Sequence, residues 1–119
     1  MIFVLFEVTV KKEGMHRYLT LAAALKKELE QARGFIRSER FQSLTNERKL
    51  LSLSVWESEQ AVEEWRNTMN HRMSQQQGRK SLFDSYTLTV TTKIRSYTKH
   101  DRTEAPQDSE EFFAGSSFD

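Results

Sequence analysis

Alternation of apolar and polar residues along the chain predicts four β-strands. The alternating segments cover residues 2–10, 35–42, 49–57 and 82–97. The first is apolar on both faces at its start, which is typical of a strand that is buried on both sides. The second is more polar, and turn-forming residues separate it from the third, so these two predict a hairpin.

Two further segments show the three- and four-residue spacing of amphipathic helices. The first covers residues 15–32, and Gly34 stands where a left-handed helix cap is expected. The second begins after Ser58, a suitable N-cap, and its apolar stripe continues through Trp65 and Met69. The order βαββαβ predicts an α+β, ferredoxin-like fold with an antiparallel sheet and both helices on one face.

The face of this sheet that carries no helices needs a second cover. Phe3 and Leu5, or else their even-numbered neighbours, must lie on that face. Burial against a second copy of the chain would cover them. We therefore expect a homodimer whose sheets pack face to face.

The length of 119 residues fits one domain, which we place at residues 1–97. Residues 98–119 break the periodicity, contain the only proline and carry a net charge of −4, against +5 for the preceding part. This composition predicts an acidic, flexible tail. The alternative is that Phe112, Phe113 or Phe118 anchors the tail on the basic domain or on a partner subunit.

Several classes of protein and site are disfavoured. Without cysteine there is no disulfide or thiolate metal site, which is typical of a cytoplasmic protein, and no metal site is expected from the spacing of Glu13 and His16 alone. The apolar N-terminus is interrupted by Glu7 and is too short to span a membrane. RNA-recognition modules share the predicted topology, but Arg37 stands where their stacking aromatic belongs, so no nucleic-acid partner is expected.

Three residues are candidates for chemistry. Trp65 should face the sheet, but His71 lies about 120° away from it on an unbroken helix. The two converge only if the helix breaks near Asn70, and the sequence leaves both arrangements open. Glu7 interrupts an apolar strand, and it is either an ion-pair partner of strand arginines or a cavity-lining acid or base.

Four segments resemble the antibiotic biosynthesis monooxygenase family of dimeric α+β barrels. They are GFIRSERFQS, KLLSLSVWES, EQAVEEWRNTMNHRMSQQQGR and LFDSYTLTVTTKIRSY. The resemblance covers about residues 1–97, and its most telling parts are the strand ending in Trp56 and the spacing from Trp65 to His71 before Gly78. It implies a dimer with sheets packed into a barrel, as the strand pattern suggests independently.

The resemblance also implies a function, because members of this family include oxygenases that oxidise phenols or quinols without metal, flavin or haem. Such chemistry needs an apolar cavity, a base and donors that stabilise an oxyanion. We therefore expect no cofactor and a small aromatic or apolar substrate. The candidate catalytic residues are His71, Trp65 and Glu7, and the candidate substrate-binding residues are Arg72, Tyr86, Trp56 and Met69.

Two alternatives belong beside this interpretation. A haem-degrading branch of the family uses an asparagine, a tryptophan and a histidine; Trp65 matches, but Glu7 and Gln75 occupy the other two positions, which makes haem degradation the weaker hypothesis. His71 could still ligate haem if the helix breaks. The second alternative is a non-catalytic dimeric protein that binds a small molecule or acts in a stress response, because fold alone does not confer activity.

Overall fold

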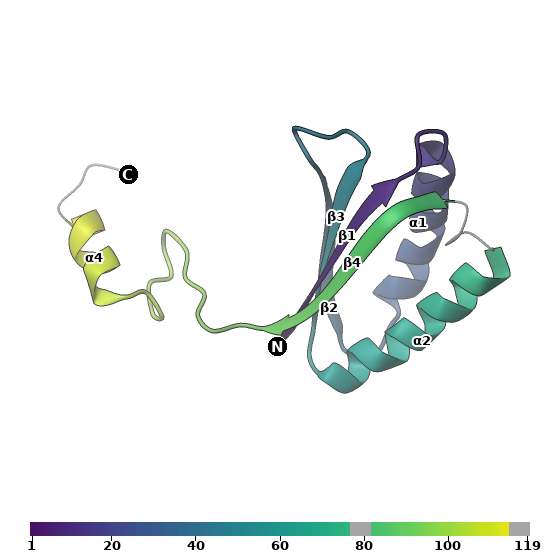
Figure 1. Ribbon diagram of the computed structural model, residues 1–119. Helices are drawn as coiled ribbons and strands as arrows, with labels where there is room; N and C mark the ends of the chain where they lie inside the picture. The colour runs from purple at the N-terminus through teal and green to yellow at the C-terminus, as the bar shows by residue number, and fades with distance from the viewer. Residues whose placement is uncertain (77–81, 115–119) are drawn as a thin grey trace.

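The computed structural model describes residues 1–76 and 82–114, except for the side chains of residues 73–76 and 111–114 (Figure 1). Within these residues the predicted βαββαβ order is present. The elements are β1 (Ile2–Val10), α1 (Met15–Glu30), β2 (Phe35–Gln42), β3 (Lys49–Trp56), α2 (Glu59–Gln76) and β4 (Phe83–Thr92), followed by α4 (Gln107–Ala114).

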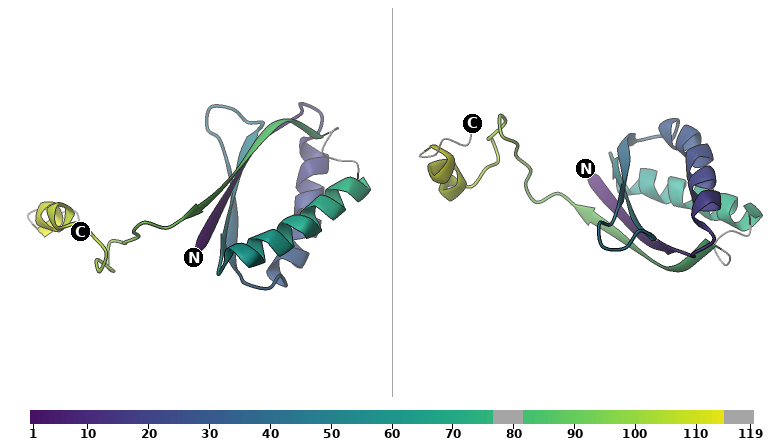
Figure 2. Two further views of the ribbon diagram at one scale, coloured as in Figure 1. Left: turned by 60° about the horizontal axis from the view of Figure 1, so that its bottom comes forward. Right: turned by 90° about the horizontal axis from the view of Figure 1, so that it is seen from above.

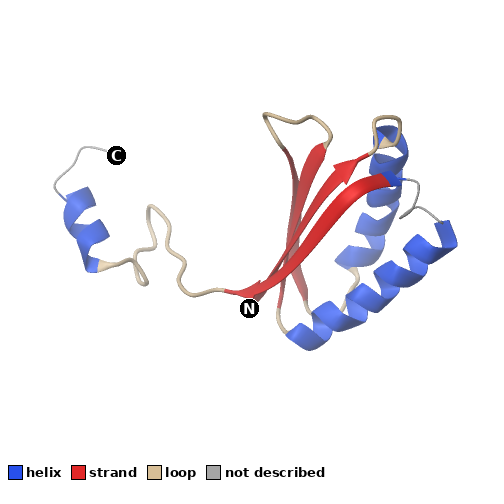
Figure 3. Ribbon diagram, in the orientation of Figure 1, coloured by secondary structure: helices blue, strands red, loops and turns tan. Residues whose placement is uncertain are grey.

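The described strands form one antiparallel sheet in the order β2-β3-β1-β4. Both α1 and α2 lie on the same side of it, as Figure 3 shows. The predicted α+β, ferredoxin-like fold is therefore confirmed. In this arrangement β2 and β4 are the edge strands, and β1 and β3 form the centre.

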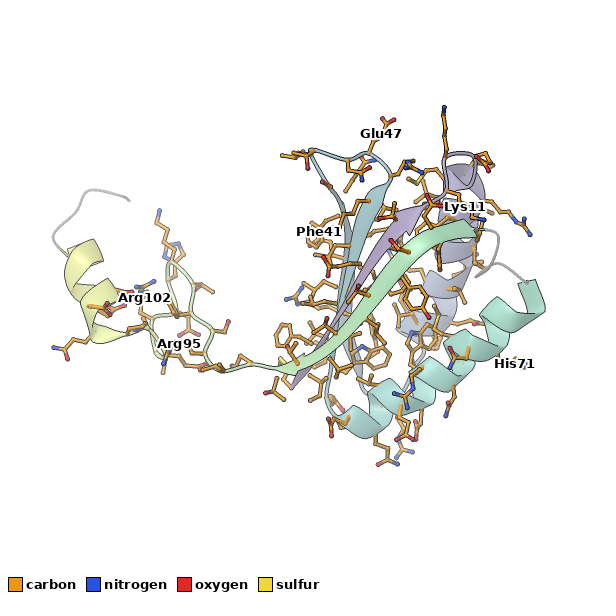
Figure 4. All side chains as sticks on the ribbon, in the orientation of Figure 1. Lys11, Phe41, Glu47, His71, Arg95 and Arg102 are labelled. Atoms are coloured by element: carbon orange, nitrogen blue, oxygen red, sulfur yellow. The ribbon has the colours of Figure 1, made fainter. Side chains whose placement is uncertain are left out.

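The two faces of β1 have different surroundings. Its even-numbered residues face the helices: Val8 and Val10 are almost fully buried there. Phe3 and Leu5 lie on the opposite, outer face and are partly buried. Phe41 lies on that face too, pointing from β2 away from the helices (Figure 4). The outer face is thus the apolar surface for which the sequence predicts a partner subunit, and that partner stays a prediction.

The buried core is divided into two clusters at opposite ends of the sheet. One cluster is built around Trp56, with Ile2, Val4, Ala61 and Val62. The other consists of Val8, Val10, Tyr18 and Leu50. Neither cluster fills the middle of the inner face, and this division positions the site described below.

The last strand is shorter than its sequence pattern predicts. Alternation continues to residue 97, but β4 ends at Thr92. Thr92 pairs with Ile2, the first residue of β1, so β4 ends where its pairing with β1 ends. The partner strand, and not the side-chain pattern, therefore determines where β4 ends.

Gly34 adopts the left-handed conformation that its position predicts, with φ of 80°. It does not cap α1 directly, because α1 ends at Glu30 and Gln31 is the C-cap; Gly34 instead turns the chain into β2. A Cβ atom at Gly34 would lie 2.6 Å from the Cβ of Ala61 on α2. The turn therefore requires glycine for two independent reasons.

We expect Gly34→Ala to lower the free energy of unfolding by at least about 1–3 kcal/mol, the usual cost of a left-handed non-glycine residue. The contact with Ala61 adds to that cost. Urea unfolding followed by circular dichroism measures the change. The control is Gly14→Ala, because Gly14 has φ of −101° and a Cβ there would meet its nearest atom at 3.3 Å. Equal effects of the two substitutions would contradict this account.

Beyond β4 the chain runs away from the sheet (Figures 1 and 2). This C-terminal arm, residues 93–114, has contacts of its own. Lys93 pairs with Glu104 at 2.9 Å, and Arg102 pairs with Glu110 and lies 4.9 Å from the ring centroid of Tyr97. Together with α4, these contacts give the arm local structure, and its flexibility stays a prediction.

The predicted anchors of the tail cannot be placed. The side chains of Phe112 and Phe113, and all of Phe118, lie outside the described residues. Their docking on a partner subunit stays a prediction.

Candidate active-site cavity

A cavity of about 640 Å³ lies between the inner face of the sheet and the two helices that cover it. It occupies the space that separates the two core clusters, since its lining includes Val4 and Trp56 from one cluster and Tyr18 from the other. Pockets that bind small organic molecules usually measure about 300–1,000 Å³. The volume therefore suits a ligand of that size.

Two rows of residues that cross the sheet form the floor of the cavity. In each row the positions on β2 and β3 are polar and those on β1 and β4 are apolar. The first row is Arg40, Ser52, Phe6 and Leu88, and the second is Ser38, Ser54, Val4 and Val90. Because serine is small, Ser52 and Ser54 leave open the space that larger core residues occupy at the two ends of β3.

Aromatic side chains form much of the cavity wall. Trp56 is fully buried, and its ring centroid lies 6.2 Å from that of Trp65 on α2. The indole Nε1 of Trp56 donates a hydrogen bond to Oγ of Ser54 at 2.9 Å, which fixes the ring against the floor. Towards β4, Tyr86 packs against Phe6 with a centroid distance of 5.7 Å. These rings provide flat apolar surfaces on which an aromatic ligand could stack.

Tyr18 and Arg40 meet beside the polar half of the floor. The guanidinium carbon of Arg40 lies 5.8 Å from the ring centroid of Tyr18. Burial raises the pKa of the Tyr18 hydroxyl above its ordinary value, while the charge of Arg40 acts in the opposite direction. The phenol of Tyr18 is thus a hydrogen-bond donor at neutral pH.

This shift predicts a pH dependence of stability. An unfolded tyrosine ionises near pH 10, but buried Tyr18 does not until higher pH, so the folded state loses stability as the pH rises past about 10. Tyr18→Phe should remove that loss. The difference in unfolding midpoint between wild type and Tyr18→Phe should therefore move in favour of the variant between about pH 8 and pH 11.

Chemical denaturation at several pH values measures this difference. Tyr97→Phe, which removes a hydroxyl from the C-terminal arm, is the control. A constant difference between wild type and Tyr18→Phe across the range would show that ionisation of Tyr18 is not linked to unfolding.

The structure brings together four of the residues predicted for the site. Trp65 and Met69 reach the cavity from α2, Trp56 from β3 and Tyr86 from β4. They meet because Trp56 and Tyr86 lie on the inner face of the sheet, and Trp65 and Met69 lie on the apolar stripe of α2 that faces it. Their roles in catalysis or substrate binding stay predictions.

His71 does not join them. Helix α2 is continuous from Glu59 to Gln76, so the break near Asn70 that would turn His71 towards Trp65 is absent. His71 is exposed on α2 (Figure 4) and does not line the cavity. Of the two arrangements that the sequence leaves open, the structure has the unbroken helix, in which His71 faces solvent.

We expect His71→Ala to change the affinity for 1-naphthol, a small aromatic probe, by no more than about twofold, as is usual for a surface substitution. Trp65→Ala, which removes a cavity wall, should weaken binding by about five- to tenfold. Isothermal titration of both variants tests the pair. A larger effect of His71→Ala than of Trp65→Ala would show that His71 acts on the site.

Glu7 and Arg72 also lie apart from the cavity lining. Glu7 lies on the outer face of β1, and its carboxylate is 3.9 Å from the ammonium group of Lys49. Arg72 forms an ion pair with Glu28 and so ties α2 to α1. Of the two interpretations of Glu7, the cross-strand ion pair describes its surroundings, although the partner is a lysine on β3.

Sequence reasoning missed Tyr18, Arg40 and the floor serines. A signal was present in KLLSLSVW, where serines occupy every second position of a strand between Leu50 and Trp56. The pattern indicates a polar face. The pattern does not show whether this polar face is the inner or the outer face of the sheet, because that depends on how β3 pairs with β1.

The described residues contain no group of three or more side chains suited to holding a metal ion. In the same part of the chain, no helix has the length and apolar character needed to cross a bilayer.

Comparison with known proteins identifies the family. The family model described as antibiotic biosynthesis monooxygenase matches residues 1–77, which is more than half of the chain. The chain belongs to the antibiotic biosynthesis monooxygenase family. The resemblance noted in the sequence is thereby confirmed.

One relative within the antibiotic biosynthesis monooxygenase family is a protein from Pyricularia oryzae named jasmonate monooxygenase ABM. It is 37% identical over 99 residues, which are 81% of this chain and 46% of the relative. The chain therefore spans about half the length of the curated relative that it matches. The activity named for that relative belongs to a longer protein.

Several solved structures share the fold of this chain. A conserved protein from Methanosarcina mazei Go1 matches with a TM-score of 0.69 and 22% identity, covering 77% of this chain and 91% of its own. SnoaB, a cofactor-independent oxygenase from Streptomyces nogalater, matches with a TM-score of 0.65 and 12% identity, covering 80% and 94%. At these identities the likeness concerns the fold alone.

Proposed function

We propose that the chain is a monooxygenase that oxidises a small, largely apolar aromatic molecule, of the phenol or quinol type, in the cavity beneath α1 and α2. The observation that carries this proposal is the cavity itself, which opens where the core divides and is walled by Trp56, Trp65 and Tyr86. Membership of the family supports oxygenation as the reaction.

The proposed reaction uses no cofactor, because an electron-rich substrate can reduce oxygen itself. In the simplest case a methylene group next to a phenol reacts with O₂: two C–H bonds break, one oxygen atom forms a carbonyl and the other leaves as water. The substrate supplies all the electrons. The protein then has to bind the phenolate form of the substrate and stabilise the charge that develops on oxygen.

The cavity contains groups suited to these tasks. The guanidinium of Arg40 favours a nearby phenolate by its charge, and so lowers the pKa of a phenol bound beside it. The hydroxyls of Tyr18 and Tyr86 can donate hydrogen bonds to an oxyanion. Ionisation of the substrate in this field could proceed by loss of a proton to solvent, without a histidine base.

One observation favours the second candidate, a protein that binds a small molecule without catalysis. Among the described residues that line the cavity none is a histidine, and Glu39 is the one carboxylate. Proton abstraction in an enzyme is usually made by a positioned side chain, most often a histidine. Binding alone would need only the apolar walls and the polar half of the floor.

Oxygen uptake by the purified chain tests the proposal, with hydroquinones, naphthols and anthrone-type phenols as substrates. Thermal unfolding with the same compounds measures binding, because a ligand of the folded state raises the melting temperature. Uptake above the background rate, with an oxidised product, supports the oxygenase. A raised melting temperature without uptake across the panel would overturn it in favour of the binding protein.

The relative from Pyricularia oryzae adds one further substrate to the panel, jasmonate. Hydroxylation of an aliphatic carbon consumes two electrons that such a substrate does not supply. The jasmonate assay therefore includes NADPH as an electron donor. Uptake with jasmonate alone among the compounds would replace the phenol class by that substrate.

We also propose that the chain forms a homodimer through the outer face of the sheet. Phe3, Leu5, Leu51 and Leu53 lie together there on neighbouring positions of β1 and β3. Burying these side chains against a second copy would remove apolar surface from water. Light scattering at micromolar concentration that gives the mass of one chain would overturn this proposal.

A further inference from the structure

The floor of the cavity is polarised from one edge of the sheet to the other. In both rows that cross it, the residues on β2 and β3 carry hydroxyl or guanidinium groups, and those on β1 and β4 are apolar. The polar half contains Ser38, Ser52, Ser54 and Arg40. A ligand without a polar end would leave these groups poorly solvated, and a ligand polar throughout would not match the other half.

The charges around the cavity have one dominant sign. Its cationic lining residues are Lys26, Arg37, Arg40 and Arg66, whereas Glu39 is the carboxylate among the described lining residues. Arg37 and Glu39 pair with Val55 and Leu53 of β3, which are on the outer face of the sheet. Arg40 pairs with Ser52 on the inner face, so it is the charged residue of β2 that belongs to the cavity floor. The polar half therefore favours an anion.

Arg40 is held in place by a ring and not by a carboxylate. Its guanidinium lies over buried Tyr18, and among the described residues it forms no ion pair with an acidic side chain. Arg72 on α2, by contrast, is paired with Glu28 on α1. Arg40 is thus available to a bound anion, and its planar fork suits two oxygens of one group.

From this geometry we propose that the cavity takes an amphipathic carboxylate, with the carboxylate bound by Arg40 and the floor serines and the apolar body lying on Val4, Phe6, Leu88 and Val90. This assignment deepens the proposed function and rests on it, since it narrows the substrate of the same cavity to an aromatic molecule that also carries a carboxylate, which takes the place beside Arg40. Arg40 is then the residue that determines specificity for the charged end. The phenol oxygen is then left to the hydroxyls of Tyr18 and Tyr86, and the oxidised carbon lies on the apolar half of the floor.

Three probes that share one apolar body test the sign of the charge. They are 5-cyclohexylpentanoate, its methyl ester and 5-cyclohexylpentylamine, which carry a negative, a neutral and a positive end. None absorbs where tryptophan does, and both tryptophans of the chain line the cavity, so tryptophan fluorescence reports binding. We expect the carboxylate to bind about tenfold more tightly than the ester, and the amine more weakly than either.

Three substitutions locate the effect. Arg40→Gln should weaken binding of the carboxylate by about tenfold and leave the ester unchanged. Arg40→Lys keeps the charge without the planar fork and should retain part of the preference. Arg17→Gln removes the same charge from an exposed position of α1 outside the cavity lining, and it should change neither affinity.

The outcomes separate this inference from the proposed function. Equal affinity for the carboxylate and the ester, tighter binding of the amine, or no binding of any probe would overturn the inference. So would an equal loss in Arg40→Gln and Arg17→Gln. Oxygen uptake with a neutral phenol, measured independently, would keep the proposed oxygenase even then. Failure of uptake with intact, Arg40-dependent carboxylate binding would remove the oxygenase and keep the anionic site.

Discussion

Trp56→Ala is expected to lower the free energy of unfolding by about 3–5 kcal/mol, the usual range for removal of a buried tryptophan. Small domains are stable by only about 5–15 kcal/mol, so the variant should be close to unfolding at room temperature. Trp56 has no exposed surface, packs edge-on against Phe35 at 5.5 Å and donates a hydrogen bond to Ser54. Its loss would join an empty space to a cavity that is already present.

Urea unfolding followed by circular dichroism at 222 nm measures this change. The matched control is Trp65→Ala, because Trp65 lines the same cavity but is only partly buried. Trp56→Phe keeps a ring and loses the hydrogen bond, so it should cost about 1–3 kcal/mol. If Trp65→Ala were as destabilising as Trp56→Ala, the structural role assigned to Trp56 would be wrong.

The secondary structure could be predicted because its signals are local. Period-two alternation in residues 2–10 and the three- and four-residue spacing of residues 15–32 each exclude the other element. The order of elements then leaves few arrangements of a four-stranded sheet. The end of β4 was not predictable in this way, since it depends on where β1 begins.

The inner face of the sheet could not be chosen from the sequence. β1 is apolar on both faces near its start, so Phe3 and Leu5 are as plausible in the core as Ile2 and Val4. The choice decides the position of Glu7, which follows its odd-numbered neighbours to the outer face. It also decides that the serines of β3 face the helices and leave a cavity.

The continuity of α2 was equally undetermined. Asn67 and Asn70 are weak helix formers, but each costs only about 0.7 kcal/mol relative to alanine. Tertiary contacts outweigh a preference this small. In α2 these contacts are made by Met69, which faces the cavity, and by Arg72, which pairs with Glu28 on α1. These contacts join residues far apart in the sequence, and so the sequence pattern of α2 alone does not contain them.

The second large effect concerns function without loss of stability. Ser52→Leu places a branched apolar side chain in the middle of the cavity floor, between Phe6 and Arg40. We expect binding of 1-naphthol to weaken by at least about tenfold, because the added side chain occupies ligand space. We expect the free energy of unfolding to stay the same or to rise by about 0.5–2 kcal/mol, as cavity-filling substitutions commonly do.

Isothermal titration and urea unfolding of the same preparation separate these two effects. Ser85→Leu is the matched control: Ser85 is an exposed serine that pairs with Thr9 on the outer face, so its replacement should leave binding unchanged. Native affinity in Ser52→Leu would mean that ligands do not occupy the middle of the floor. The expected result is reduced affinity with native stability in Ser52→Leu, and unchanged affinity in Ser85→Leu. This result would show that the gap between the two core clusters is kept open for a ligand, because the fold itself gains nothing from leaving it empty.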